Sequence, residues 1–259
     1  MPERRPRAGP GEGVVKAQTV GTAPYRPLQS GSRMTRTDSL FFRALEPEEG
    51  WRGQREATSA SQRARMLDAI ARAVAHKGYA RVTVGDVVAE AGVSRRTFYE
   101  QFKDKEDCFL AAYVTGTEAL IGDIAEASLA VGPDADWREV IQAAIDTYVG
   151  TLADDPEFAR TFLVDVLGAG PAAVELRGKV YEQFVQQYVI LARRAARQEA
   201  EIGEVPEVYL RALVGGIGEL VQQHVLTKGA KTLPELAPVL VRLVKAVIQG
   251  AAAPAPTST

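Results

Sequence analysis

The sequence is poor in the residues that build disulfides and most metal sites. Its 259 residues include one cysteine, Cys108, and two histidines, His76 and His224. A lone cysteine excludes an internal disulfide framework and is typical of a reducing compartment. These three residues lack the spacing of a zinc site, and no serine lies in a G-x-S-x-G nucleophile elbow. We therefore expect no metal, no cofactor and no catalytic centre.

Long apolar runs and alternating patterns are also missing. No uninterrupted apolar run approaches the roughly 20 residues of a membrane-spanning helix. No apolar signal core follows the basic N-terminus. No segment alternates with the two-residue period of a half-buried strand. We expect a soluble, cytoplasmic protein without membrane association, and an all-α fold.

Charge is distributed unevenly along a chain whose net charge is −2. Residues 61–105 hold nine Lys and Arg against five Asp and Glu, whereas residues 106–259 carry a net charge of −9. A basic front on an acidic body is typical of a protein with one module that faces a polyanion.

Composition and apolar periodicity divide the chain into four parts. Residues 1–58 form a basic arm rich in proline and glycine, for which we expect disorder. This arm is either an unstructured tail or a segment that touches DNA; Met34 is an alternative start, and Leu40–Phe42 and Trp51 are apolar islands without a predicted partner. Residues 59–105 and 106–250 are expected to form two helical domains, followed by a disordered tail at 251–259.

Three helices are expected in the first domain. The first has the apolar spacing of an amphipathic helix, at Leu67, Ile70, Ala71 and Val74. The second begins after an N-cap at Thr83 and ends at Gly92, which tolerates a positive φ. Ser94 caps the third. Two short helices joined by a glycine turn and supported by a longer helix form the plan of a helix-turn-helix.

The third helix has two different faces. At about 100° per residue, Phe98 and Phe102 point to the core, and Arg96, Thr97 and Glu100 point away from it. Arg95 and Tyr99 flank the boundary. Such a helix fits the major groove of DNA, where arginine bonds guanine in bidentate fashion. Glu100 is ambiguous, because its carboxylate either accepts from cytosine or repels phosphate. The alternative is a packing module without DNA contact.

The stretch TVGDVVAEAGVSRRTFYEQFKDKEDCFLAAY, Thr83 to Tyr113, resembles the DNA-binding domain of the TetR family of bacterial transcriptional regulators. The resemblance implies base or sugar contacts from Arg95, Arg96 and Thr97. The full DNA-binding set that it implies is Thr83, Val84, Ser94, Arg95, Arg96, Thr97, Tyr99 and Lys105. The helix-turn-helix core at the corresponding positions is Val88, Gly92, Phe98 and Phe102. Val88 departs from the pattern, because the family often has alanine there.

In the acidic part of the chain, the sequence predicts a long helix that starts at Asp104, followed by five amphipathic helices. Their apolar stripes begin at Trp137, Phe158, Tyr181, Tyr209 and Leu236. Three arginines near the end of the Tyr181 helix are expected to interact with its C-terminal dipole: Arg193, Arg194 and Arg197.

Aromatic residues on these stripes are either ordinary core or the wall of a ligand cavity, and the family implies a cavity among the middle helices. The candidate lining residues are Tyr148, Phe158, Phe162, Tyr181, Phe184, Tyr188 and His224. His224 alternatively is a buried or interface histidine.

The segment GGIGEL, Gly215 to Leu220, lacks the features of a phosphate-binding loop, and its small residues favour close helix packing. With the last helix it resembles the family's two-helix dimerisation face. The candidate interface residues are Gly215, Gly216, Ile217, Leu220, Leu240, Leu243 and Val247.

These observations predict a homodimeric regulator, expected to be a repressor, that binds a palindromic double-stranded DNA operator and is released by a small-molecule effector. One alternative is an effector-independent regulator controlled by a protein partner. The other is an enzyme in the helical domain, which the missing catalytic constellation argues against.

Overall fold

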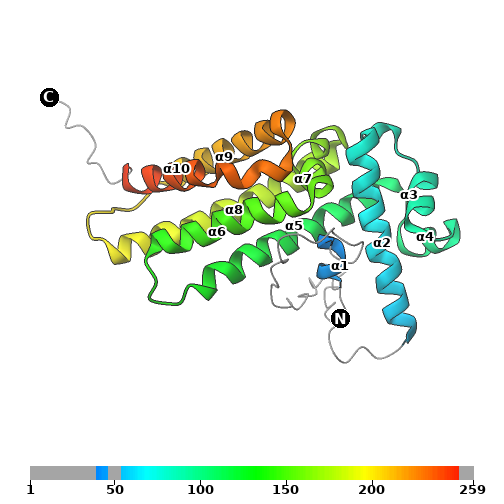
Figure 1. Ribbon diagram of the computed structural model, residues 1–259, viewed down its shortest axis with the longest axis horizontal. Helices are drawn as coiled ribbons and strands as arrows, with labels where there is room; N and C mark the ends of the chain where they lie inside the picture. The colour runs from blue at the N-terminus through cyan, green and yellow to red at the C-terminus, as the bar shows by residue number, and fades with distance from the viewer. Residues whose placement is uncertain (1–38, 46–53, 251–259) are drawn as a thin grey trace, which may run out of the picture.

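The computed structural model describes residues 39–45 and 54–250, and every regular element within these ranges is a helix. The predicted all-α class is confirmed. Helix α2 (Gln54–Lys77), the short turn η2 (Tyr79–Arg81), α3 (Val84–Ala91) and α4 (Arg95–Gln101) form the N-terminal module. Figure 1 shows α3 and α4 at one end of an elongated molecule, beside α2.

The larger helical domain follows directly. It consists of α5 (Lys105–Ala130), α6 (Trp137–Asp154), α7 (Pro156–Leu163), the turn η3 (Asp165–Gly168), α8 (Pro171–Gln198), α9 (Glu207–Lys228), the turn η4 (Ala230–Leu236) and α10 (Ala237–Gly250). Helices α9 and α10 lie side by side, away from α3 and α4 (Figure 1). Buried residues of both domains belong to one continuous core cluster.

Side-chain caps define the two short helices. The backbone N–H of Asp86 donates to Thr83 Oγ1 at 3.2 Å, and Asp86 Oδ2 accepts from the Thr83 backbone N–H at 2.9 Å. Helix α3 ends at Gly92, which has φ 64°. The Thr97 backbone N–H donates to Ser94 Oγ at 3.0 Å and starts α4. Both caps and the glycine turn lie where the sequence predicts them, because capping acts within three residues of its own helix start.

Helix α5 is shared by the two domains. It begins at the Asp104 cap, whose Oδ1 accepts from the Asp107 backbone N–H at 2.9 Å, and it contacts α2 as well as α6, α7 and α8. Within the described residues it is the one helix long and apolar enough to cross a membrane by length and composition. A core helix passes the same test, and α5 is packed on several sides by other helices.

A short helix, α1 (Leu40–Ala44), lies within the segment that the sequence assigns to a disordered arm. Leu40 and Phe41 are fully buried, and α1 contacts both α2 and α5 (Figure 1). The Phe41 ring meets the Phe158 ring edge-on, with centroids 6.0 Å apart, and Arg43 pairs with Asp123 at 3.3 Å. The assignment of residues 1–58 is therefore wrong for α1 and for the start of α2 at Gln54. An amphipathic pattern of five residues is too short to identify a docked helix.

The rest of the predicted arm, residues 1–38 and 46–53 with Met34 and Trp51, lies outside the described residues. The predicted tail, 251–259, also lies outside them.

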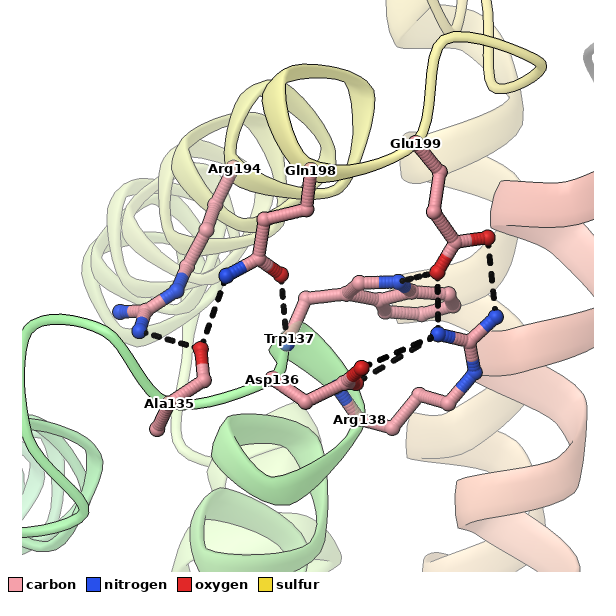
Figure 2. A network of polar contacts seen from close by, with 7 residues as sticks. All are labelled: Ala135, Asp136, Trp137, Arg138, Arg194, Gln198 and Glu199. Atoms are coloured by element: carbon pink, nitrogen blue, oxygen red, sulfur yellow. Dashed lines mark hydrogen bonds and ion pairs between the residues drawn. The ribbon is translucent and has the colours of Figure 1, made fainter.

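A polar network joins the start of α6 to the end of α8 (Figure 2). The indole N–H of the buried Trp137 donates to Glu199 at 2.8 Å, and Glu199 also pairs with Arg138, whose guanidinium lies over the indole ring. These two contacts hold the pKa of Glu199 below its usual value, the Arg138 hydrogen bond most strongly. Arg194 donates to the carbonyls of Gly132, Pro133 and Ala135.

Arg194 therefore corrects one expectation. Its guanidinium binds the carbonyls of the α5–α6 loop instead of the C-terminal carbonyls of its own helix. The loop approaches α8 only in the tertiary structure, so helix position alone pointed to the wrong partner.

We expect the Asp86 carboxyl to titrate at about pH 2. Its pKa lies below the ordinary 3.8 because Lys77 Nζ donates to it at 2.6 Å, and Thr83 donates from its side chain and backbone. A lowered folded-state pKa contributes stability above pH ~4 that is lost as pH falls toward 2. Lys77→Met should raise the midpoint toward 3.8, as measured by NMR titration. Lys103→Met is the matched control and should leave it unchanged; equal midpoints in wild type and Lys77→Met would contradict the assignment.

Truncation of Phe41 should test whether α1 is docked. Removing a fully buried phenylalanine side chain costs about 3–5 kcal/mol, so Phe41→Ala should lower the free energy of unfolding by that amount in urea denaturation. The control Leu129→Ala changes an exposed side chain and should cost less than about 0.5 kcal/mol. A loss below about 1 kcal/mol for Phe41→Ala would mean that α1 does not pack on the core.

Candidate functional site

Helix α4 presents one buried face and one exposed face. Phe98 and Phe102 are buried against the core, with ring centroids 5.6 Å apart, and Arg63 lies over the Phe102 ring. Arg95 and Arg96 are exposed, and the Tyr99 side chain is 55% exposed with its ring edge-on to Phe98. The buried aromatic pair thus orients guanidinium and phenol groups toward solvent from a rigid helix.

Glu100 has a partner on this exposed face. Its Oε1 accepts from Arg96 Nε at 2.9 Å, one helical turn away. Both side chains are largely exposed, so the pair is worth little and separates easily. The carboxylate therefore balances Arg96 in the free protein, and its charge is not buried.

The remaining predicted DNA-contact residues occupy different positions. The Thr83 and Ser94 hydroxyls serve in the helix caps, and both side chains are exposed next to α4. Val84 is half-buried in the core. Lys105 is also half-buried: its ammonium donates to the Tyr79 carbonyl at 3.0 Å and lies 4.2 Å from the centre of that ring.

Lys103 is a basic residue that sequence reasoning did not include. It lies in the turn between α4 and α5, and its side chain is exposed and without a polar partner among the described residues. The sequence shows both lysines, two residues apart. Which of them is free to contact DNA depends on the position of Tyr79, whose carbonyl and ring bind the Lys105 ammonium.

The helix-turn-helix core is assembled by three elements. Val88 is half-buried, and its carbonyl accepts the backbone N–H of Val93 at 3.1 Å as the chain turns through Gly92. Phe98 and Phe102 are buried in the same core cluster on the other side of that turn, and Arg63 of α2 lies over the Phe102 ring. A valine at position 88 is therefore accommodated in the short-helix pair.

A cavity of about 400 Å³ lies in the second domain between α5, α6, α7, α8 and α9. Five of the aromatic candidates line it: Tyr148, Phe162, Tyr181, Phe184 and Tyr188. Sequence reasoning missed the polar lining residues Arg177, Gln187 and Gln222. The apolar stripes of α8 and α9 do not fix the rotation of each helix about its own axis closely enough to show that these polar residues face the cavity.

Two candidates lie elsewhere. Phe158 packs beneath the cavity against α1 and α5, stacked on Phe162 at 5.5 Å between centroids. His224 is buried, and its Nε2 lies 2.9 Å from Thr232 Oγ1, joining α9 to η4. Both side chains are buried outside the cavity, because Phe158 on α7 and His224 on α9 lie on faces of their helices that point away from it.

The candidate interface residues divide in the same way. Leu240 is fully buried in the monomer and Ile217 nearly so. A Cβ at Gly215 would stand 2.7 Å from the Tyr181 hydroxyl, so this glycine faces α8. A Cβ at Gly216 would meet no heavy atom of the described residues within 4 Å. The Leu220 side chain is 40% exposed. Leu243 and Val247 are half-buried on α10. The outward-facing part of the predicted set is therefore Gly216, Leu220, Leu243 and Val247.

Comparison with known proteins gives consistent results. Residues 66–112 match the family of bacterial regulatory proteins of the tetR type. An uncharacterized HTH-type transcriptional regulator of Mycobacterium tuberculosis is 27% identical over 137 residues, 52% of this chain and 56% of the relative. The chain thus spans little more than half the length of that curated relative.

Solved structures of low identity have the same fold. The fatty acid degradation regulator FadR from Bacillus halodurans superposes with a TM-score of 0.62 at 17% identity, over 71% of this chain and 94% of that one. FadR from Bacillus subtilis, in complex with stearoyl-CoA, gives 0.61 at 20% identity over 71% and 97%. A TetR-family regulator from Marinobacter aquaeolei gives 0.58 at 20% identity over 74% and 98%.

The helix-turn-helix of residues 83–102, its match to the family and the shared fold of the helical domain agree with one another. Residues 66–112 therefore carry the DNA-binding domain of the tetR family of bacterial regulatory proteins, and the chain is similar over about half its length to a relative named an HTH-type transcriptional regulator.

Proposed function

We propose that the protein is a homodimeric repressor that binds a palindromic operator and that a small molecule in the α5–α9 cavity controls its DNA affinity. The observation that carries the DNA-binding part is the two-faced helix α4. Phe98 and Phe102 anchor it, and Arg95, Arg96 and Tyr99 face solvent. A helix held in this way can enter the major groove with guanidinium groups that reach base edges and phosphates. Cytoplasmic location follows from this role.

Dimerisation is supported by the outer face of α9 and α10. On α9, Ala212, Gly216 and Leu220 recur every four residues on the face turned away from the core. The absence of a side chain at Gly216 lets another helix approach closely. A two-fold dimer through this face would present two α4 helices to successive turns of DNA, about 34–36 Å apart or a multiple of it.

Helix α7 supports a connection between the cavity and the DNA-binding module. Phe162 lines the cavity, stacked on Tyr113 at 5.6 Å between centroids. The preceding residue, Thr161, is buried and donates from its hydroxyl to the Ala71 carbonyl on α2 at 3.0 Å. A ligand that displaces Phe162 would therefore act on a helix that is hydrogen-bonded to the DNA-binding module.

The relative with bound stearoyl-CoA supports a ligand-responsive regulator of this fold. The cavity also favours a small-molecule effector over control by a protein partner alone. A ligand would change DNA affinity by favouring one relative placement of the two α4 helices over another.

Loss of Arg95 should weaken specific DNA binding. An operator is first obtained by selecting random duplexes with the wild-type protein, and its affinity is then measured by fluorescence anisotropy. Arg95→Ala should lower the specific affinity of the dimer at least about 30-fold, because it removes one base contact in each subunit and each contact contributes about 1–3 kcal/mol. The control Arg193→Ala removes an exposed arginine of α8 and should leave affinity unchanged. Unchanged binding by Arg95→Ala would refute its contact, and failure to select any sequence would refute the operator.

A charge on the outer face of α9 should separate the dimer. Leu220→Glu places a carboxylate where two apolar faces would meet, and sedimentation velocity should show a monomer at concentrations at which wild type is a dimer. Leu167→Glu is the control, since this exposed leucine lies in η3, outside α9 and α10. A monomeric wild type, or a dimeric Leu220→Glu, would contradict the proposed interface.

A further inference from the structure

The cavity is long and narrow. Its lining on α5 extends from Tyr113 to Leu129, about 24 Å at a rise of 1.5 Å per residue. The lining on α8 extends over a similar length, from Arg177 to Arg194. A volume of about 400 Å³ spread over this length fits an elongated molecule better than a compact one.

One end of the cavity has an apolar rim. Leu129 and Ile190 both line the cavity, and their side chains are 78% and 60% exposed. Between this rim and the far end, the wall is formed mainly by aliphatic and aromatic side chains of α5, α6 and α8. An apolar chain along this path would be removed from water at both the rim and the wall.

Among the described residues, the ionisable lining residues other than tyrosine are two arginines, and none is acidic. Arg194 is engaged with three backbone carbonyls of the α5–α6 loop. Arg177, at the opposite end of α8, makes no hydrogen bond or ion pair within residues 39–45 and 54–250. The cavity thus contains one half-buried cation whose charge the surrounding described residues do not balance.

Two phenols accompany Arg177. Burial raises the pKa of Tyr113 and Tyr148 above the ordinary value, and the nearby Arg177 charge opposes that rise in both. The two side chains therefore remain neutral hydrogen-bond donors at physiological pH, and their hydroxyls have no partner in the part of the chain that the structure describes. Tyr181 differs, because its hydroxyl already donates to the Arg211 carbonyl at 2.6 Å.

We infer that the cavity binds an elongated molecule with one anionic head group of carboxylate size at Arg177, Tyr113 and Tyr148, and with its apolar body directed toward Leu129 and Ile190. The guanidinium and the two neutral phenol hydroxyls can all donate to such a head group, whereas a cationic head group would be repelled by Arg177. A neutral ligand would leave the charge of Arg177 desolvated and unpaired. The inference rests on the proposed function, in which this cavity holds the effector.

Direct binding to three probes of matched chain length tests the head group. Calorimetry at pH 7.5, without DNA, compares dodecanoate, 1-dodecanol and dodecylammonium. Dodecanoate should bind at least about ten-fold more tightly than the other two, because a hydrogen bond to a charged group contributes about 1.5–3 kcal/mol. Arg177→Gln should bring dodecanoate within about three-fold of 1-dodecanol. Unchanged affinity of this variant for 1-dodecanol would show that its cavity is intact, and the control Arg193→Gln should behave as wild type.

Three results would overturn the inference. The first is equal binding of dodecanoate and 1-dodecanol by wild type, and the second is a carboxylate preference that survives in Arg177→Gln. The third is tighter binding of dodecanoyl-CoA than of dodecanoate, insensitive to Arg177→Gln, which would place the polar head at the rim. Operator affinity measured with and without dodecanoate is a separate test: bound dodecanoate without any change would refute the effector role and leave the binding site standing.

Discussion

The ring of Phe158 lies against the bare backbone of Gly116, where a Cβ would stand 2.3 Å from the nearest ring carbon. This close approach brings α7 onto α5, and Phe158 there meets Phe41 of α1 and Phe162 beside the cavity. Any side chain at position 116 would push these helices apart, since dense interiors accommodate added atoms only by shifting their neighbours. The packing of α7 on α5, beside α1, therefore depends on one glycine and one aromatic ring.

Helix α7 explains why the two domains share a core, because it contacts α2 as well as α5. Helix α7 is short, but adjacent residues on it face in different directions: Thr161 bonds α2, and Phe162 faces the cavity. Helix α1 covers the same region from outside and contacts α2 and α5 together. If the cavity holds an effector as proposed, the ligand would act on these packed helices before it reached α4, and a shift in their packing would couple ligand binding to DNA affinity.

Much of the DNA-binding module could be predicted because its determinants are local. A cap hydrogen bond joins residues three apart, as at Thr83 and Ser94, and a positive φ belongs to the single residue Gly92. The i, i+4 spacing of Phe98 and Phe102 likewise identifies the buried side of α4, and therefore the exposed side as well. Exposed Arg95 and Tyr99 follow from that placement without knowledge of the rest of the chain.

The second domain is different, because the apolar residues of one stripe can face a cavity, a core or a partner. Phe158 and Phe162 are one turn apart, but only Phe162 lines the cavity, and Leu240 is buried although it was expected at an interface. Arg177 has no distinctive sequence context. Apart from α1 and the start of α2, the sequence by itself determined the helices, the caps of α3 and α4 and the orientation of α4, since these depend on spacing along the chain. Only the tertiary structure decided what each long helix faces, because small rotations of packed helices exchange core, cavity and surface positions.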